Sequence, residues 1–154
     1  MDKGFTFLEL LIVLAVLSTI TVIGADSMRA FAETSSLNSA TDSVLAAVEQ
    51  AHSRTLASKQ SSQYGVHFQN DQVILFQGAT YTAGSASNTV TMLPPRSQIA
   101  TVSLTGGGNE VIFNRLTGAT AQPGSIILSS RQNASVQKTI IILTTGLSYL
   151  SNVP

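Results

Sequence analysis

The stretch GFTFLELLIVLAVLSTITVIGA, residues 4–25, decides the fold of this chain. Residues 10–25 carry no charge, and residues 5–9 lengthen the largely apolar run to 21 residues, with Glu9 as its one charged side chain. At about 1.5 Å per residue a helix over this run is about 31 Å long, which matches the roughly 30 Å hydrocarbon core of a bilayer. The pattern therefore predicts a transmembrane helix.

The flanking charges indicate its orientation. Lys3 is the only basic residue before the run, and Arg29 is the first after it. Positive charge is retained on the cytoplasmic side of a membrane helix. We therefore expect a cytoplasmic N-terminus, with most of the chain outside.

A cleaved secretory signal peptide and a signal anchor are the ordinary alternatives, because both have a basic start and an apolar run. Both must accommodate Glu9, since a charged residue costs roughly 2.5 to 3.5 kcal/mol at mid-helix on insertion scales and less near an end. The signal peptide also needs small residues before its cleavage site, and residues 22–25 meet that need only in part ahead of Asp26. Neither alternative gives Glu9 a purpose.

Residues 4–17, GFTFLELLIVLAVL, resemble the prepilin signature of type IV pilins and type II secretion pseudopilins. That signature is glycine, an aromatic residue, Thr, an aliphatic or aromatic residue, Leu and Glu, followed by an apolar helix. The resemblance implies that a prepilin peptidase cuts between Gly4 and Phe5, discards the leader 1–4, and leaves a Phe5 amine that is N-methylated. Glycine suits such a site because no side chain obstructs the approach of the protease to the backbone.

The resemblance also gives Glu9 a role. In related filaments its carboxylate is thought to pair with the N-terminal amine of a neighbouring subunit, which sets subunit assembly and register. Such a buried pair need not add net stability, yet leaving one partner alone is costly. A carboxylate that only reaches back to the membrane interface is the alternative.

The same family implies particular partners and a location. The expected partners are other pilins or pseudopilins, the prepilin peptidase, an inner-membrane assembly platform, and membrane lipid before assembly. The expected location is the bacterial inner membrane, crossed once with the N-terminus cytoplasmic, and then a periplasmic or extracellular filament.

Beyond residue 25 the pattern becomes amphipathic. Apolar residues recur at spacings of three and four along one face, while Ser, Thr, Asn and Gln fill the other: Leu37, Ala40, Val44, Ala47, Val48 and Ala51. No proline precedes Pro94, so one helix over residues 5–56 is expected. Gly24 is the only glycine inside it and marks a position for a bend or local melting; a rigid continuous helix is the alternative.

From residue 63 onward the pattern is that of strands. Residues 64–68 and 72–76 flank the turn formers QND at 69–71 and predict a hairpin. Further strands are predicted at 89–93, 99–104, 110–113, 125–128 and 139–143. The expected fold is α+β and pilin-like: a long N-terminal helix, membrane-spanning in its first half, packed against a C-terminal antiparallel β-sheet domain. Its parts are the leader 1–4, the transmembrane and filament-core helix 5–25, the amphipathic half 26–58 and the β-rich globular domain 59–154.

The C-terminal segments resemble the GspH/FimT-like minor pilins: VIFNRLTG at 111–118, GSIIL at 124–128 and TIIILTTG at 139–146. Subunits of this kind are expected in small numbers at a filament tip or in a priming complex. Some FimT-like members bind DNA through arginines in a basic C-terminal tail. Here residues 146–154 contain no Lys or Arg, and phosphate neutralisation dominates DNA affinity, so we expect no nucleic acid partner.

Composition and motifs point away from catalysis. The charges of eight basic and eight acidic residues cancel, so net charge indicates no nucleic acid, acidic substrate or anionic lipid as a general partner. The absence of cysteine excludes disulfides and thiol chemistry. His52 and His67 have no acidic or histidine residue at ligand spacing, and no nucleophile elbow, phosphate-binding loop or carboxylate pair occurs.

We therefore predict a structural assembly protein with no enzymatic activity, cofactor or metal, whose working residues are Gly4, Phe5 and Glu9. A tip-located binding module, for DNA uptake or adhesion, is the alternative function, and a signal-anchored domain with an unrecognised activity is another. Pilus and secretion pseudopilus use the same subunit architecture, so both stay open.

Overall fold

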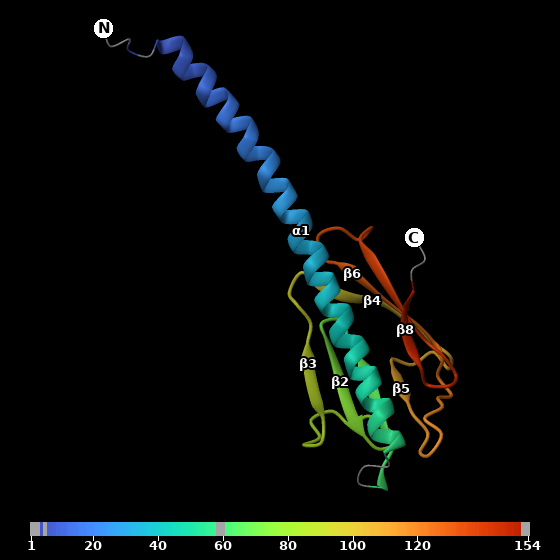
Figure 1. The fold of residues 1–154 in the computed structure, drawn as a ribbon. Helices are drawn as coiled ribbons and strands as arrows, with labels where there is room; N and C mark the ends of the chain where they lie inside the picture. Colours follow the sequence, from blue (N-terminus) through green and yellow to red (C-terminus); the bar gives the residue numbers. More distant parts are fainter. Residues whose placement is uncertain (1–3, 5, 58–60, 152–154) are drawn as a thin grey trace.

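A computed structural model describes residues 4, 6–57 and 61–151, with the backbone alone for residues 22–26. Within these residues one long helix, α1 (Phe7–Leu56), precedes all the strands. Figure 1 shows the first half of α1 projecting as a free rod, while the β-rich part of the chain packs around the second half. The strands are β1 (Tyr64–Phe68), β2 (Gln72–Gln77), β3 (Thr89–Met92), β4 (Ser97–Leu104), β5 (Glu110–Ile112), β6 (Gly124–Ser130), β7 (Gln137–Ile142) and β8 (Ser148–Ser151).

The predicted continuous helix is found. The helical backbone passes through Gly24 without interruption, so this structure has the unbroken helix rather than a break at that glycine. The helix ends at Leu56, and the Ala57 amide that follows it donates to the Ser53 carbonyl at 2.9 Å.

The second half of α1 provides one side of the core. All six residues of the predicted face are buried, with exposed fractions of 8% or less. They pack against large side chains of both sheets, among them Phe68, Phe113 and Ile126. Two threonines are also buried on the helix, and their hydroxyls donate to carbonyls one turn earlier: Thr41 to Leu37 at 2.7 Å and Thr55 to Ala51 at 2.8 Å. The buried face therefore leaves neither hydroxyl unsatisfied.

The strands form two antiparallel four-stranded sheets, in the orders β3-β2-β1-β5 and β4-β6-β7-β8. The predicted hairpin is confirmed, because β1 pairs with β2 and the Gln69 amide donates to the Gln72 carbonyl across the turn. The sequence indicated one sheet domain without dividing it. Pro94 and Pro95 follow β3 and lack the N–H that would continue its ladder, and the chain then enters β4, whose partner is β6.

Strand β8 was not predicted from the sequence. It pairs with β7, with Ile140 opposite Leu150, after a turn in which Gly146 has φ of 85°. Only a glycine takes that backbone conformation without strain. A four-residue, half-exposed strand carries too weak an alternation to be recognised alone, and the neighbouring strand is what stabilises it.

Candidate functional site

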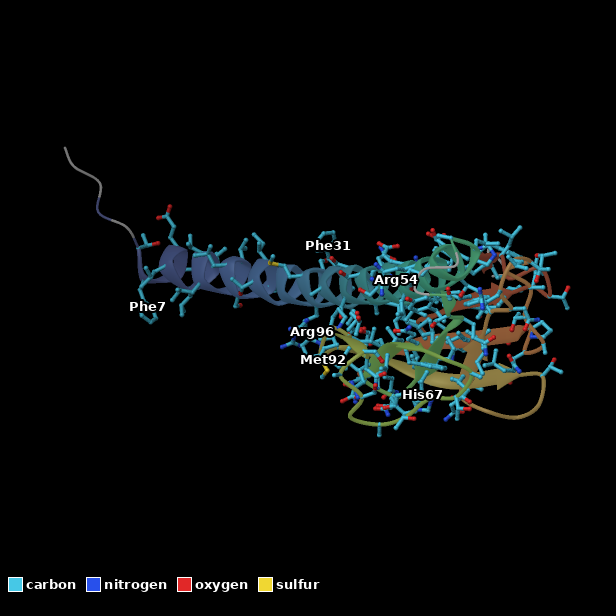
Figure 2. The ribbon with its side chains drawn as sticks, turned by 90° about the horizontal axis from the view of Figure 1, so that it is seen from below. Phe7, Phe31, Arg54, His67, Met92 and Arg96 are labelled. Carbon is cyan, nitrogen blue, oxygen red and sulfur yellow. The ribbon has the colours of Figure 1, made fainter. Side chains whose placement is uncertain are left out.

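The first half of α1 has no partner within the described chain. Its large apolar side chains, from Phe7 to Ile20, are exposed on every side of the helix, by 45% at Val13 and 76% at Phe7 (Figure 2). A contiguous apolar surface of this kind on a soluble protein marks a membrane or protein contact. The free half of the helix, defined here as residues 7–21, is therefore the first part of the candidate site.

The polar residues inside the free half satisfy their own hydrogen bonds. The hydroxyls of Ser18 and Thr19 donate to the carbonyls of Ala15 and Val16 at 2.8 Å, and the Thr21 hydroxyl donates to the Leu17 carbonyl at 3.0 Å. A hydroxyl that bonds to the preceding turn needs no water. These residues therefore place no unsatisfied donor in an apolar environment.

The predicted span over residues 5–25 lies partly outside the described residues, because Phe5 and the side chains of residues 22–26 are not described. Among the side chains that are described, no helix has a stretch that is both long and apolar enough to be assigned as a membrane span.

Gly4 lies just ahead of the helix and is exposed. A Cβ atom added at Gly4 would meet no other heavy atom within 4 Å. Nothing in the fold therefore requires glycine at this position. Phe5 and residues 1–3 of the predicted leader fall outside the described residues.

The helix begins with an N-cap that the sequence analysis did not identify. The Thr6 hydroxyl accepts a hydrogen bond from the Glu9 amide at 3.2 Å, and the Leu10 amide donates to the Thr6 carbonyl at 3.2 Å. Thr and Glu three residues apart are the sequence pattern of a capping box, in which the threonine caps the first turn. The signal, Thr6-Phe7-Leu8-Glu9, was present in the sequence and could have been read.

The cap explains the Glu9 backbone but leaves its carboxylate available. Glu9 is exposed, and its side chain makes no hydrogen bond or ion pair with any residue that the structure describes. A carboxylate in the first turn also interacts favourably with the helix dipole. Among the described residues, Glu9 is thus a negative charge without a partner at one end of an uncovered apolar surface.

The two histidines lie apart from this site. His67 stacks on Tyr81, with ring centroids 4.1 Å apart, and its Nδ1 lies 3.8 Å from Glu110 Oε2. Glu110 could not be linked to His67 from the sequence, because the two residues face each other across the β1–β5 ladder, 43 positions apart in the chain. His52 packs edge-on against Phe113. In the described part of the chain, no three His, Asp or Glu side chains gather where they could hold a metal ion.

Comparison with protein families gives two matches. The model of the prokaryotic N-terminal methylation motif matches residues 1–25, and that of the type II transport protein GspH matches residues 40–146, well over half of the chain. No curated protein and no solved structure matches.

The two matches cover different parts of the structure. The methylation motif covers the free half of the helix with its cap, and the GspH model covers residues 40–56 of α1 with strands β1 to β7. Residues 26–39 and strand β8 lie outside both matches. Pilins and pseudopilins are structural subunits that are anchored in a membrane and then assembled with other pilins into filaments. The chain therefore belongs to the GspH family and is a type IV pilin or pseudopilin subunit, not an enzyme.

Proposed function

We propose that this chain is a minor subunit of a type IV pilus or a type II secretion pseudopilus. A prepilin peptidase cuts it between Gly4 and Phe5, and the new Phe5 amine is N-methylated. The chain is stored in the bacterial inner membrane through residues 5–25, with its N-terminus cytoplasmic, and an assembly platform then moves it into a periplasmic or extracellular filament. The observation that carries the proposal is a helix half that is exposed in all directions and joined to a folded domain by unbroken helix.

Both stages give the free half of the helix a cover. In the membrane, lipid chains surround the apolar side chains, and the self-bonded hydroxyls of Ser18, Thr19 and Thr21 need no other partner. In the filament, the helices of neighbouring subunits replace the lipid. Cutting after Gly4 leaves a single residue, Phe5, ahead of the Thr6 cap, so the mature amine lies at the very start of the helix.

Glu9 supplies the register in this proposal. Its carboxylate has no partner among the described residues of its own subunit, and the amine of a neighbouring Phe5 has the complementary charge. Two charges buried together in an apolar filament core must meet, because leaving either one unpaired costs about 3 to 5 kcal/mol. A neighbouring subunit that is shifted along the filament axis, so that its Phe5 amine no longer meets Glu9, is disfavoured by that free energy.

The direct test is the intact mass and N-terminal sequence of the chain purified from cells with and without a prepilin peptidase. We expect an N-methylated Phe5 terminus with the peptidase and an intact leader without it. A chain that begins near Asp26, or at Met1 in both strains, would contradict the processing step and with it the assignment to the pilin pathway.

A binding role at a filament tip is the second candidate. It is favoured by Leu116 and Leu147, which are 80% and 59% exposed. Their turns lie at the C-terminal end of α1, because added Cβ atoms at Gly118 and Gly146 in the same turns would both meet His52. An apolar surface of this kind suits a protein contact better than DNA. Replacing both leucines by serine should abolish such a contact while leaving filament assembly unchanged.

A further inference from the structure

A shallow hollow lies where the free half of α1 meets the folded domain. It has a volume of about 470 Å³ and is lined by α1 on one side and the β3–β4 turn on the other: Phe31, Ser35, Ser39, Pro94, Pro95 and Arg96. No residue of the proposed processing and register machinery contributes to it. It therefore needs an explanation of its own.

Exposed apolar side chains and one cation lie on the segments that form the hollow, and of these Phe31 and Arg96 line it. Met28, Phe31 and Met92 are 74%, 75% and 62% exposed. Arg96 is also exposed, and it forms no ion pair with any described carboxylate. Figure 2 shows Phe31, Met92 and Arg96 at the end of the domain from which the free half of the helix emerges. Apolar side chains and a cation without a described ion pair, gathered at one end of the domain, match a lipid headgroup layer, which offers hydrocarbon beneath phosphate.

The continuous helix determines how far this surface lies from the bilayer core. No linker separates the free half of α1 from the domain, since the helix runs from Phe7 to Leu56. The hydrocarbon layer is roughly 30 Å thick, and the helix rises about 1.5 Å per residue. If the layer begins at Phe7, it therefore ends near residue 26. Met28 and Phe31 then lie roughly 3 and 7 Å further on, within a headgroup layer about 5 to 7 Å thick.

We propose that, before assembly, this surface rests on the outer face of the inner membrane. Met28, Phe31 and Met92 enter the headgroup layer, and the Arg96 guanidinium binds lipid phosphate, because its planar fork of donors matches the phosphate oxygens. We call these four residues the membrane-contact rim. The inference rests on the membrane insertion in the proposed function, and adds that the folded domain itself binds lipid and holds one orientation.

The chain contains no tryptophan, so a single introduced tryptophan is a clean probe. Phe31→Trp and Met92→Trp variants of the full chain are placed in vesicles whose phospholipids carry bromine near the headgroup. We expect both to lose most of their fluorescence to the brominated lipid and to be shielded from acrylamide in water. The matched control is Leu116→Trp in the exposed turn at the other end of the domain, which should keep its fluorescence in these vesicles and remain open to acrylamide.

A further variant separates this inference from the proposed function. Leu17→Trp reports on the free half of the helix, and bromine deep in the acyl chains should quench it. If deep bromine does not quench Leu17→Trp, both membrane insertion and the membrane-contact rim are overturned. Quenching of Leu17→Trp without quenching of Phe31→Trp and Met92→Trp would overturn the rim alone. Shielding from acrylamide without lipid quenching would mean that a second copy covers the hollow, which also contradicts the proposal.

The role of Arg96 is tested in the Met92→Trp background with anionic vesicles. Removing one cation beside an anionic surface should shift the balance from membrane-contacting to released domain about fivefold, so Arg96→Gln should reduce the lipid quenching. Arg115→Gln, in the distal turn, is the matched control and should have no effect. Equal quenching in both variants would overturn the assignment of Arg96 to lipid phosphate.

Discussion

The two halves of α1 belong to one unbroken helix and meet opposite surroundings. In the free half, Leu10, Leu14 and Leu17 are each more than half exposed. In the second half, Leu37, Val44 and Val48 are at most 1% exposed. Both halves are apolar, so hydrophobicity alone does not separate them. The free half has large side chains on all faces and is not covered by any described residue, whereas the second half has one apolar face that two sheets cover.

Small residues account for the close fit of the second half. Ala40, Ala47 and Ala51 share its buried face with the larger Leu and Val side chains, and Ala40 and Ala51 have no exposed surface. Short side chains let the strands approach the helix closely enough to exclude water. The second half of this helix therefore carries the residues that fold the domain, and the free half carries the residues available for assembly.

The largest effect should come from blocking the removal of the leader, residues 1–4, from the free half of α1. Gly4→Val should abolish cleavage and leave the leader attached, because a branched side chain obstructs the protease. The folded domain should be unchanged, since an added Cβ at Gly4 meets nothing within 4 Å. The check is the intact mass of the chain from cells with a prepilin peptidase. Gly4→Ala is the control and should retain some cleavage; normal processing of Gly4→Val would refute the assignment of the cut.

The next effect isolates the Glu9 charge. Glu9→Gln keeps the shape of the side chain and its place three residues after the Thr6 cap, so the precursor should still insert and be cleaved. Assembly should fall sharply, because the neighbouring amine is then buried without a counter-charge, which costs about 3 to 5 kcal/mol. Co-purification with filaments measures it, with Glu49→Gln, exposed in the second half, as control. Normal incorporation of Glu9→Gln would remove the charge from the register mechanism.

The same substitution made in each half tests the comparison directly. Leu37→Ala should reduce the free energy of unfolding of the domain by about 2 to 5 kcal/mol, because Leu37 is buried in the core. Leu14→Ala, at a 55% exposed position, should change it by less than about 0.5 kcal/mol. Urea unfolding of the full chain in detergent, followed by circular dichroism, measures both. Similar losses in the two variants would show that the halves are not independent.

The smallest effect concerns the cap. Thr6→Ala should destabilise the first turn of α1 by about 1 kcal/mol, while Thr6→Ser should be close to the parent chain. Amide hydrogen exchange at residues 8–10 in detergent micelles reports the change. Identical exchange in the alanine variant and the parent would show that the Thr6 hydroxyl does not stabilise the helix start.

Much of the architecture could be predicted because its signals are local. The helix over residues 7–56, its buried face and the β1–β2 hairpin all follow from spacing and turn residues within short windows. The division into two sheets could not be predicted, because Ser97–Leu104 pairs with Gly124–Ser130 and not with the strand before it. Strand β8 was missed for the same reason: its stability comes from β7, not from its own four residues.

The candidate site divides in the same way. Gly4, Phe5 and Glu9 were identified from contiguous residues, and their roles stay predictions. The hollow was not identified, because Phe31 and Arg96 are 65 positions apart and line the same hollow only when the turn after β3 packs beside α1.

By itself, the sequence determined that this chain has an apolar helix start with a capping signal and one carboxylate, followed by an amphipathic continuation, since hydrophobic periodicity and capping act over a few residues. The tertiary structure alone decided which strands pair, which charges remain unpaired and where Arg96 lies relative to the helix. These depend on contacts between residues far apart in the chain, which local patterns do not encode.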